Sequence, residues 1–204
     1  MTSTAQHTQV VQKQFGEQAA AYLSSAVHAQ GSEFALLQAE LAGQGEARVL
    51  DLGCGAGHVS FHVAPLVKEV VAYDLSQQML DVVAGAAVDR GLSNIITVNG
   101  AAERLPFADG EFDVVASALV IHFIPDRAKA FVEMKRVLRP GGLVGGYTWK
   151  RTATTDFAAY APILEGVARI GGEPLRSPVV SEGSTDGMRA SLATIMLMLA
   201  LGFV

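Results

Sequence analysis

The sequence predicts one α/β domain of three layers, in which helices cover both faces of a mostly parallel sheet. Strand-like apolar runs alternate with helical segments between residues 48 and 149, which is typical of parallel sheets. The first of these runs leads into glycines at alternate positions, Gly53, Gly55 and Gly57, where a strand can turn sharply into a helix. Half of the 204 residues are hydrophobic, which is enough to bury one core.

The predicted elements follow one another at regular intervals. Strands are expected at residues 48–52, 70–73, 94–98, 112–117 and 143–149. Helices are expected between them at residues 58–66, 77–90 and 125–138. Ser76 is the predicted N-cap of the second helix, and the run Arg139-Pro140-Gly141-Gly142 is expected to close the third.

Both ends of the chain are predicted to be helical. Residues 8–44 have apolar positions at helical spacing, with Phe15, Ala19, Tyr22 and Leu23 on one face. Residues 187–201 are also expected to form a helix. The apolar segment 192–204 is shorter than the roughly 20 residues that span a bilayer, so we interpret it as a buried helix or a contact surface rather than a membrane anchor.

Charge and cysteine content exclude several classes of function. The net charge of −5 and the absence of a Lys/Arg run argue against a nucleic-acid partner and favour a small substrate. A single cysteine, Cys54, excludes an intrachain disulfide and a multi-cysteine metal site. The histidines show no convincing metal-ligand spacing, so no metal is expected. The N-terminus lacks the pattern of a signal peptide, and we expect a cytoplasmic protein.

The segments with the most informative chemistry all follow predicted strand ends. They are the glycine turn, Asp74, residues 100–103 and residues 117–122. In a parallel sheet the ligand lies beyond the carboxyl ends of the strands, where the strand order reverses, so these segments are expected to converge on one crevice. The glycine spacing does not match a dinucleotide fingerprint, because His58 and Ser60 stand where its third glycine would fall in the two registers.

Several motifs in order resemble the class I S-adenosylmethionine-dependent methyltransferases, type-11 group, which includes enzymes of ubiquinone biosynthesis. The resemblance covers about residues 10–150. It rests on Val-Leu-Asp-Leu-Gly-Cys-Gly-Ala-Gly, Ala-Tyr-Asp-Leu-Ser-Gln-Gln-Met-Leu, Ala-Glu-Arg-Leu-Pro-Phe, Phe-Asp-Val-Val and Val-Leu-Arg-Pro-Gly-Gly. It implies a Rossmann-like fold, S-adenosyl-L-methionine as cofactor, S-adenosyl-L-homocysteine as product, and direct in-line methyl transfer to a small-molecule acceptor. It further implies a helical lid at residues 1–45 and a cofactor-binding core at 46–150, and residues 151–204 are expected to form a helical extension.

Two carboxylates are candidates for cofactor binding. Asp74 lies 23 positions after Asp51, close to the distance at which a βαβ unit places an acid opposite a ribose. The alternative is an acid at a helix entry. Asp51 is expected to orient the amino group of the methionine moiety, directly or through water, although it could instead bind backbone N–H groups.

The resemblance implies further contacts to the cofactor. Type-11 enzymes often have an acid at the position of Ala101; this chain has none, so adenine recognition is expected to use backbone groups at Ala101 and Ala102, with Glu103 as a side-chain partner. The other candidates implied by the resemblance are the glycines of the turn, Leu75, Met79 and Ser117. The run Leu105-Pro106-Phe107 is expected to pack structurally.

Three aromatic residues and one histidine complete the candidate site. Phe15 and Tyr22 are expected to cover the cofactor and exclude water, and ordinary core packing is the alternative. His122 is the candidate catalytic residue, as acceptor of a proton from the nucleophile, and a structural histidine is the alternative. Trp149 is assigned either to the acceptor pocket or to packing.

The end of the chain departs from the resemblance. Two further strands are common there, and the predicted helix at 187–201 suggests that they are missing. An apolar helix and an uncovered sheet edge favour self-association, so a homodimer is expected. The leading functional hypothesis is methyl transfer to a small molecule. A cofactor-binding protein without turnover is the second, and a nicotinamide-dependent oxidoreductase is a distant third.

Overall fold

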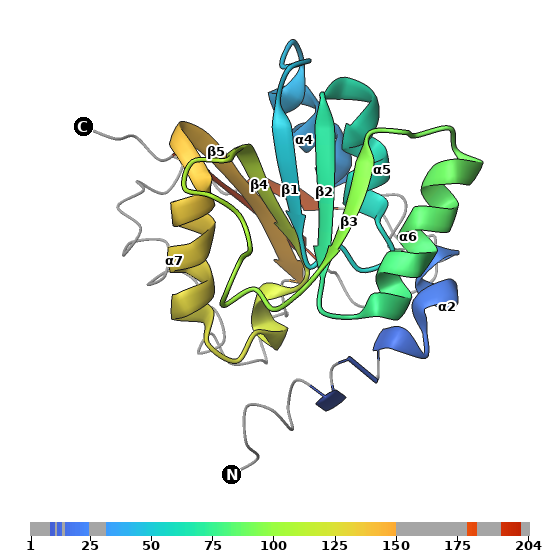
Figure 1. Ribbon diagram of the computed structural model, residues 1–204. Coiled ribbons are helices and arrows are strands. Elements are labelled where there is room, and N and C mark those ends of the chain that lie inside the picture. The colour runs from blue at the N-terminus through green and yellow to red at the C-terminus, as the bar shows by residue number, and fades with distance from the viewer. Residues whose placement is uncertain are drawn as a thin grey trace.

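The computed structural model describes residues 9–10, 12–13, 15–24, 32–149, 179–182 and 193–200. The described strands form one seven-stranded sheet in the order β3-β2-β1-β4-β5-β7-β6 (Figure 1). Their bounds are β1 Arg48–Leu52, β2 Glu69–Asp74, β3 Ile95–Asn99, β4 Phe112–Ala118, β5 Leu138–Trp149, β6 Val179–Glu182 and β7 Ala193–Ala200. Strands β1 to β5 pair in parallel, which confirms the predicted mostly parallel sheet.

The chain order places a switch point in the sheet. From β1 the chain builds outward through β2 to β3 and then returns to β4 on the other side of β1. Crossovers leave β1 and β4 in opposite directions, and ligands bind at such a point beyond the carboxyl ends of the strands. The segments singled out in the sequence therefore lie at one end of the sheet.

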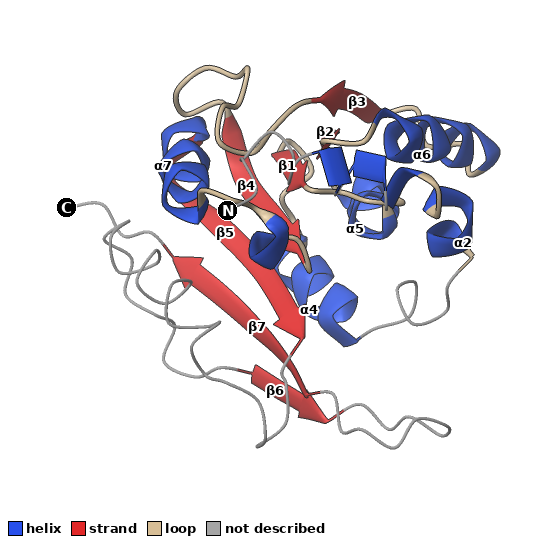
Figure 2. Ribbon diagram, turned by 90° about the horizontal axis from the view of Figure 1, so that it is seen from below, coloured by secondary structure: helices blue, strands red, loops and turns tan. Residues whose placement is uncertain are grey.

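Helices cover both faces of the sheet, as Figure 2 shows. Their bounds are α2 Ala19–Leu23, α4 Ser32–Leu41, α5 His58–Val63, α6 Gln77–Asp89 and α7 Arg127–Val137, with short 3-10 helices η1 Ala64–Leu66 and η2 Ile121–Phe123. The hydroxyl of Ser76 accepts a hydrogen bond from the N–H of Met79, which confirms the predicted cap of α6. The Asp126 carboxylate caps α7 in the same way.

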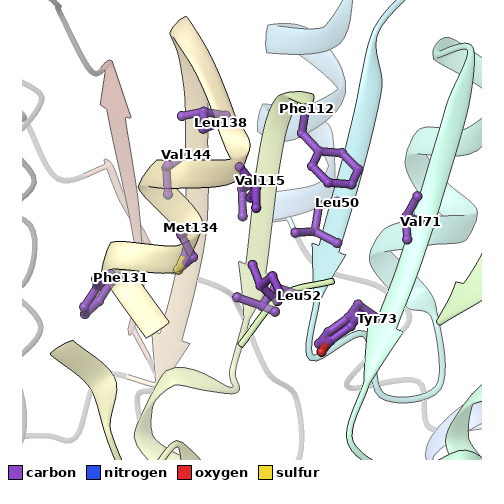
Figure 3. Close-up of a cluster of buried hydrophobic side chains, with 12 residues drawn as sticks. Leu50, Leu52, Val71, Tyr73, Phe112, Val115, Phe131, Met134, Leu138 and Val144 are labelled. Carbon is purple, nitrogen blue, oxygen red and sulfur yellow. The ribbon is translucent and has the colours of Figure 1, made fainter. Parts of the chain in front are cut away.

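Two hydrophobic layers separate the helices from the sheet. On one face α4 and α5 contribute Leu37, Leu41 and Val63 to a cluster with Val49 and Val70. On the other face Phe131, Met134 and Val137 of α7 pack against buried side chains of β1, β2, β4 and β5 (Figure 3). Side chains of one strand alternate between the two layers, as the strand period of two requires.

The connection between β3 and β4 has no helix. Instead, Leu105 and Phe107 of this connection pack into the same cluster as α7, and Phe107 contacts Tyr73 and Phe112 edge to face. The structural role predicted for Leu105-Pro106-Phe107 is confirmed by this packing. The connection thus takes the place of a helix over β2.

The sequence prediction for the end of the chain is wrong in two respects. Residues 193–200, expected within a helix, form β7, which pairs antiparallel with β5 from Leu143↔Ala200 to Trp149↔Thr194. The two strands expected to be missing are present, since β6 pairs antiparallel with β7. An open edge of β5 offers backbone hydrogen bonds, and this tertiary context overrides the helix propensity of Ala, Leu and Met. Residues 151–178 of the predicted helical extension lie outside the described residues.

A smaller difference concerns the end of α7. The run Arg139-Pro140-Gly141-Gly142 was predicted to separate helix and strand, but β5 already begins at Leu138 and includes it. The pairing with β4 shifts register between Phe112 and Val114, where Gly141 has φ 73°. Across the part of the chain that the structure describes, no helix is both long and apolar enough to cross a membrane.

Candidate cofactor site

A cavity of about 310 Å³ lies at the carboxyl ends of β1, β2, β3 and β4. Ten of the candidate residues from the sequence line it: Phe15, Tyr22, Gly53, Gly55, Asp74, Leu75, Met79, Ala101, Ala102 and Glu103. The predicted convergence of these segments on one crevice is therefore confirmed. Among its described lining residues none is Lys or Arg, while Asp74 and Glu103 supply carboxylates. Such a cavity favours a ligand that carries positive charge.

The glycine turn forms the floor of the cavity. Gly53, Gly55 and Gly57 have φ of 71°, 51° and 88°, in the left-handed region that only glycine adopts readily. A Cβ at Gly53 would lie 2.4 Å from a methyl group of Val120. The N–H groups of Gly53 and Cys54 both donate to the carbonyl of Tyr73, which ties the turn to the end of β2.

Asp74 joins the two strand ends at the cavity. Its Oδ2 accepts from the N–H of Gly55 at 2.9 Å, and its Oδ1 accepts from the N–H of Ser76 at 2.8 Å. Burial raises the pKa of this carboxyl, and the backbone hydrogen bonds oppose that rise. A carboxylate has about four acceptor positions, so each oxygen retains capacity for a further donor such as a hydroxyl. The helix-entry role and a ligand-binding role are thus compatible in one side chain.

Asp51 does not line the cavity. Its side chain is completely buried, and its Oδ2 accepts from both the N–H of Ser60 at 3.0 Å and the hydroxyl of Ser60 at 2.6 Å. This holds α5 against the end of β1, and it corresponds to the alternative of backbone binding. Its Oδ1 has no hydrogen-bond partner, and burial raises the pKa of Asp51 to about 7. Because Oδ1 is free to accept a hydrogen bond, the predicted contact of Asp51 to a ligand through water stays a prediction.

The turn after β3 forms one wall. Ala101, Ala102 and Glu103 line the cavity, and the N–H of Arg104 closes the turn onto the carbonyl of Ala101 at 3.1 Å. The Tyr73 hydroxyl donates to that same carbonyl, also at 3.1 Å. Burial raises the pKa of Tyr73 to about 12, so this hydroxyl keeps its proton and remains a donor.

The N-terminal segment covers the cavity from the other side. Phe15 lies 5.9 Å from Tyr22 and 4.9 Å from Phe123, measured between ring centroids. A ring nitrogen of His58 lies 3.0 Å from the carbonyl of Tyr22, and burial lowers the pKa of His58. The side-chain amide of Gln12 donates to the carbonyl of Leu75 at 2.9 Å. These contacts hold the segment against the strand ends, as a cover over the cavity requires.

The segment after β4 forms the opposite wall. Leu119 has φ 57°, which is unfavourable for a side chain with a Cβ, and it lines the cavity with Val120 and Phe123. Ser117 is buried and does not line the cavity. The backbone of His122 lies in η2 between lining residues, while its side chain lies outside the described part of the structure, as does that of Trp149.

Three candidates with described side chains are therefore not in the lining. Asp51 and Ser117 are buried, and Gly57 serves as the N-cap of α5. His122 stays a prediction, because its side chain is not described. Gly100, Leu119 and Val120 also line the cavity, and they lie in the segments 100–103 and 117–122 that were predicted to converge there. Other lining residues were not predicted, among them Gln12, Tyr73, Phe123, Ile124 and Pro125. Tyr73 lies at a strand end and could have been found from its position, whereas nothing in the sequence marks Gln12.

The chain resembles known proteins in sequence and in structure. Residues 50–145 match a family model described as a methyltransferase domain. A 128-residue segment is 34% identical to the uncharacterized methyltransferase YcgJ of Bacillus subtilis, covering 63% of this chain and 51% of that protein. A 152-residue segment is 34% identical to the ubiquinone/menaquinone biosynthesis C-methyltransferase UbiE of Coxiella burnetii, covering 69% of this chain and 60% of that protein.

The crystal structure of Bacillus subtilis YcgJ has the same fold, with a TM-score of 0.70 at 19% identity over 85% of this chain and 99% of that chain. The matched segments span between half and two thirds of the length of the two relatives.

The sheet order, the glycine turn and the cavity at the carboxyl ends of the strands define a Rossmann-like methyltransferase fold. Residues 50–145, slightly less than half of this chain, carry the match to the methyltransferase domain family.

Proposed function

We propose that this chain binds S-adenosyl-L-methionine in the cavity and transfers its methyl group to a small-molecule acceptor by direct in-line displacement. The observation that carries the proposal is the pairing of the open glycine turn with the Asp74 carboxylate at one end of a cavity without lysine or arginine among its described lining residues. A sulfonium cofactor is positively charged at the reacting sulfur, and the carboxylates suit that charge.

The residues of the cavity fit the parts of this cofactor. The free acceptor positions of Asp74 suit the two hydroxyls of a ribose, and the turn at Gly55, where a Cβ would meet nothing within 4 Å, presents open backbone for close approach. The wall at Ala101 and Ala102 offers backbone groups to an adenine edge. When bound, the cofactor supplies an electrophilic methyl group on a good leaving group.

The chain's own contribution is then alignment and exclusion of water. Phe15, Tyr22 and Phe123 form an aromatic cover that removes water from the reacting atoms. A dedicated base is optional for this chemistry, and His122 is proposed only for acceptors that must lose a proton.

The acceptor class is proposed from two sources. The name of the UbiE relative specifies C-methylation in ubiquinone and menaquinone biosynthesis. The segment after β4 presents apolar side chains, Leu119, Val120, Phe123 and Ile124, to the cavity. Both favour an acceptor that is apolar around its nucleophilic atom. From the net charge of −5 we further propose that the chain acts in the cytoplasm without a nucleic-acid or membrane partner.

An assay for release of S-adenosylhomocysteine tests the proposal. The chain is incubated with S-adenosylmethionine and a panel of small acceptors that includes phenols, quinols and enolisable ketones. Product formation with at least one acceptor, absent with Asp74→Ala at the same cofactor concentration, supports methyl transfer. Saturable cofactor binding without product across the panel supports the alternative of a binding protein without turnover. Tight binding of NADH without S-adenosylmethionine binding would revive the oxidoreductase hypothesis.

We also propose that the chain self-associates. Residues 193–200, expected to mediate association as a helix, form strand β7, which lies inside the described sheet between β5 and β6. The outer strands β3 and β6 are therefore the candidate contact edges, because an edge strand has unpaired backbone groups. Light scattering at micromolar concentration tests this, and a clean monomer contradicts it.

A further inference from the structure

The turn that forms the adenine-side wall is anchored at both ends. At its start, the N–H of Gly100 donates to the carbonyl of Asp74 at 3.0 Å. The turn itself, residues 101–104, closes between Ala101 and Arg104. At its end, Leu105 enters the hydrophobic cluster under α7 with 3% of its surface exposed. No helix follows β3, so the position of the turn depends on these anchors.

Glu133 and Arg136 of α7 bind the backbone of Leu105, at the end of the turn. Oε2 of Glu133 accepts from the N–H of Leu105 at 2.8 Å, and Nη2 of Arg136 donates to the carbonyl of Leu105 at 2.9 Å. Both backbone groups of one residue are thus satisfied by side chains, as a neighbouring strand would satisfy them. Nη1 of Arg136 also donates to the carbonyl of Phe107 at 2.7 Å.

The two side chains hold each other in this geometry. Nε and Nη2 of Arg136 donate to the two carboxylate oxygens of Glu133, each at 2.8 Å. The side chains are 16% and 29% exposed for Glu133 and Arg136, so the pair lies at the base of the loop rather than in open solvent. The hydrogen bonds from Arg136 lower the pKa of Glu133, which keeps this carboxylate ionised. A bidentate pair of this kind is rigid.

We propose that Glu133 and Arg136 are positioning residues that fix the turn 101–104 and thereby determine how selectively the site binds adenine. The proposal rests on the proposed function for its ligand, but the positioning itself does not need a ligand. The geometry requires an arginine, because a lysine ammonium lacks the planar fork that reaches Leu105, Phe107 and Glu133 together.

Amide hydrogen exchange of the ligand-free protein tests the positioning directly. Arg136→Gln and Glu133→Gln are expected to increase exchange at residues 101–104 by about tenfold or more, since each removes a charge-assisted contact to the loop. The control is Val137→Ala, which truncates a buried side chain next to Arg136 that does not bind the loop backbone. This variant is expected to lower the unfolding temperature, because truncation leaves a void in the core. Exchange at residues 101–104 is then expected to rise no more than exchange in the rest of the domain.

Ligand selectivity provides the second readout. Calorimetry compares S-adenosylhomocysteine with its inosyl analogue, in which a keto group replaces the adenine amino group. Wild type and Val137→Ala are expected to share one affinity ratio between the two ligands, and Arg136→Gln to reduce that ratio. Arg136→Lys is expected to behave like Arg136→Gln, whereas Asp109→Asn, which alters only the solvent-exposed contact of Arg136, keeps the wild-type ratio.

The outcomes are distinguishable. Unchanged exchange at 101–104 in both Arg136→Gln and Glu133→Gln overturns the positioning role, whatever the ligand. Equal affinity ratios in Arg136→Gln and Val137→Ala overturn the role in selectivity. If wild type binds neither ligand while the exchange result holds, the proposed function fails and the positioning role stands. If Arg136→Gln does not fold, Glu133→Gln replaces it in both the exchange and the calorimetric measurements.

Discussion

The carboxylate of Asp74 accepts a hydrogen bond from the backbone N–H of Gly55 at 2.9 Å, across 19 positions of sequence. The end of β2 is thereby fixed to the turn that follows β1. One side chain determines the shape of the turn and presents its remaining acceptor positions to the cavity. The geometry of the proposed cofactor site depends on this hydrogen bond.

Replacement of Asp74 by alanine is expected to weaken binding of S-adenosylmethionine by about 1.5–3 kcal/mol, or roughly 10- to 150-fold, through lost hydrogen bonds to a charged group. Calorimetric titration measures the change. Asp74→Asn keeps one acceptor oxygen and is expected to lie between wild type and Asp74→Ala. Unchanged affinity in both variants would show that the ribose does not bind here.

Replacement of Gly53 by alanine is expected to destabilise the domain and to weaken cofactor binding, because the turn or Val120 must shift. The new Cβ would meet Val120 at 2.4 Å and would occupy a left-handed backbone conformation that costs about 1–2 kcal/mol. The matched control is Gly85→Ala in α6, where a Cβ meets nothing within 4 Å and helix propensity predicts a gain of roughly 0.5–1 kcal/mol. Denaturant unfolding and titration of both variants test the prediction. Normal binding and stability of Gly53→Ala would show that the turn does not require glycine at this position.

Leu119 stores backbone strain in the wall of the cavity. Leu119→Gly and Leu119→Ala remove the same side-chain contacts beyond Cβ, but only glycine relieves the φ of 57°. Leu119→Gly is therefore expected to be more stable than Leu119→Ala by about 1 kcal/mol in urea unfolding. With an active acceptor, both variants are expected to raise the KM for the acceptor more than that for the cofactor. A Leu119→Ala variant as stable as Leu119→Gly would show that the strain is absent.

The buried Asp51 carboxyl is expected to make the stability of the domain depend on pH. Burial raises its pKa in the folded state from 3.8 to about 7, so between these values the folded protein binds more protons than the unfolded chain. Its contribution to the free energy of unfolding is therefore complete below about pH 4 and is lost as the pH rises through about 7. The change is roughly 4 kcal/mol at most, from about three pKa units at 1.36 kcal/mol each.

The measurement is urea unfolding of wild type and Asp51→Asn between pH 5 and pH 8. The difference in free energy between the two proteins is expected to shift in favour of Asp51→Asn as the pH rises. A constant difference across this range would mean that Asp51 is ionised throughout.

The strand ends of this fold were predictable because local signals agree with one another there. The apolar run before Asp51, the cap at Ser76 and the acid at Asp74 each mark a boundary between a strand and a helix, and the structure has those boundaries. Parallel pairing then brings the ends together, so most of the cavity lining followed from position alone.

The remainder depends on contacts that the sequence does not display. Residues 193–200 contain helix formers, and only the open edge of β5 makes them a strand. Glu133 and Arg136 are spaced like any solvated ion pair on a helix, and their role follows from a loop 28 to 31 positions away. Asp51 was assigned to the ligand from its place beside the turn, but Ser60 occupies one of its oxygens.

The most direct test of the central claim is the electron density of crystals grown with S-adenosylhomocysteine. We expect one molecule in the cavity, with its ribose hydroxyls on Asp74, its chain over the glycine turn, and its adenine against Ala101 and Ala102. A cavity without the ligand at saturating concentration, or the ligand bound at another place on the molecule, would contradict it.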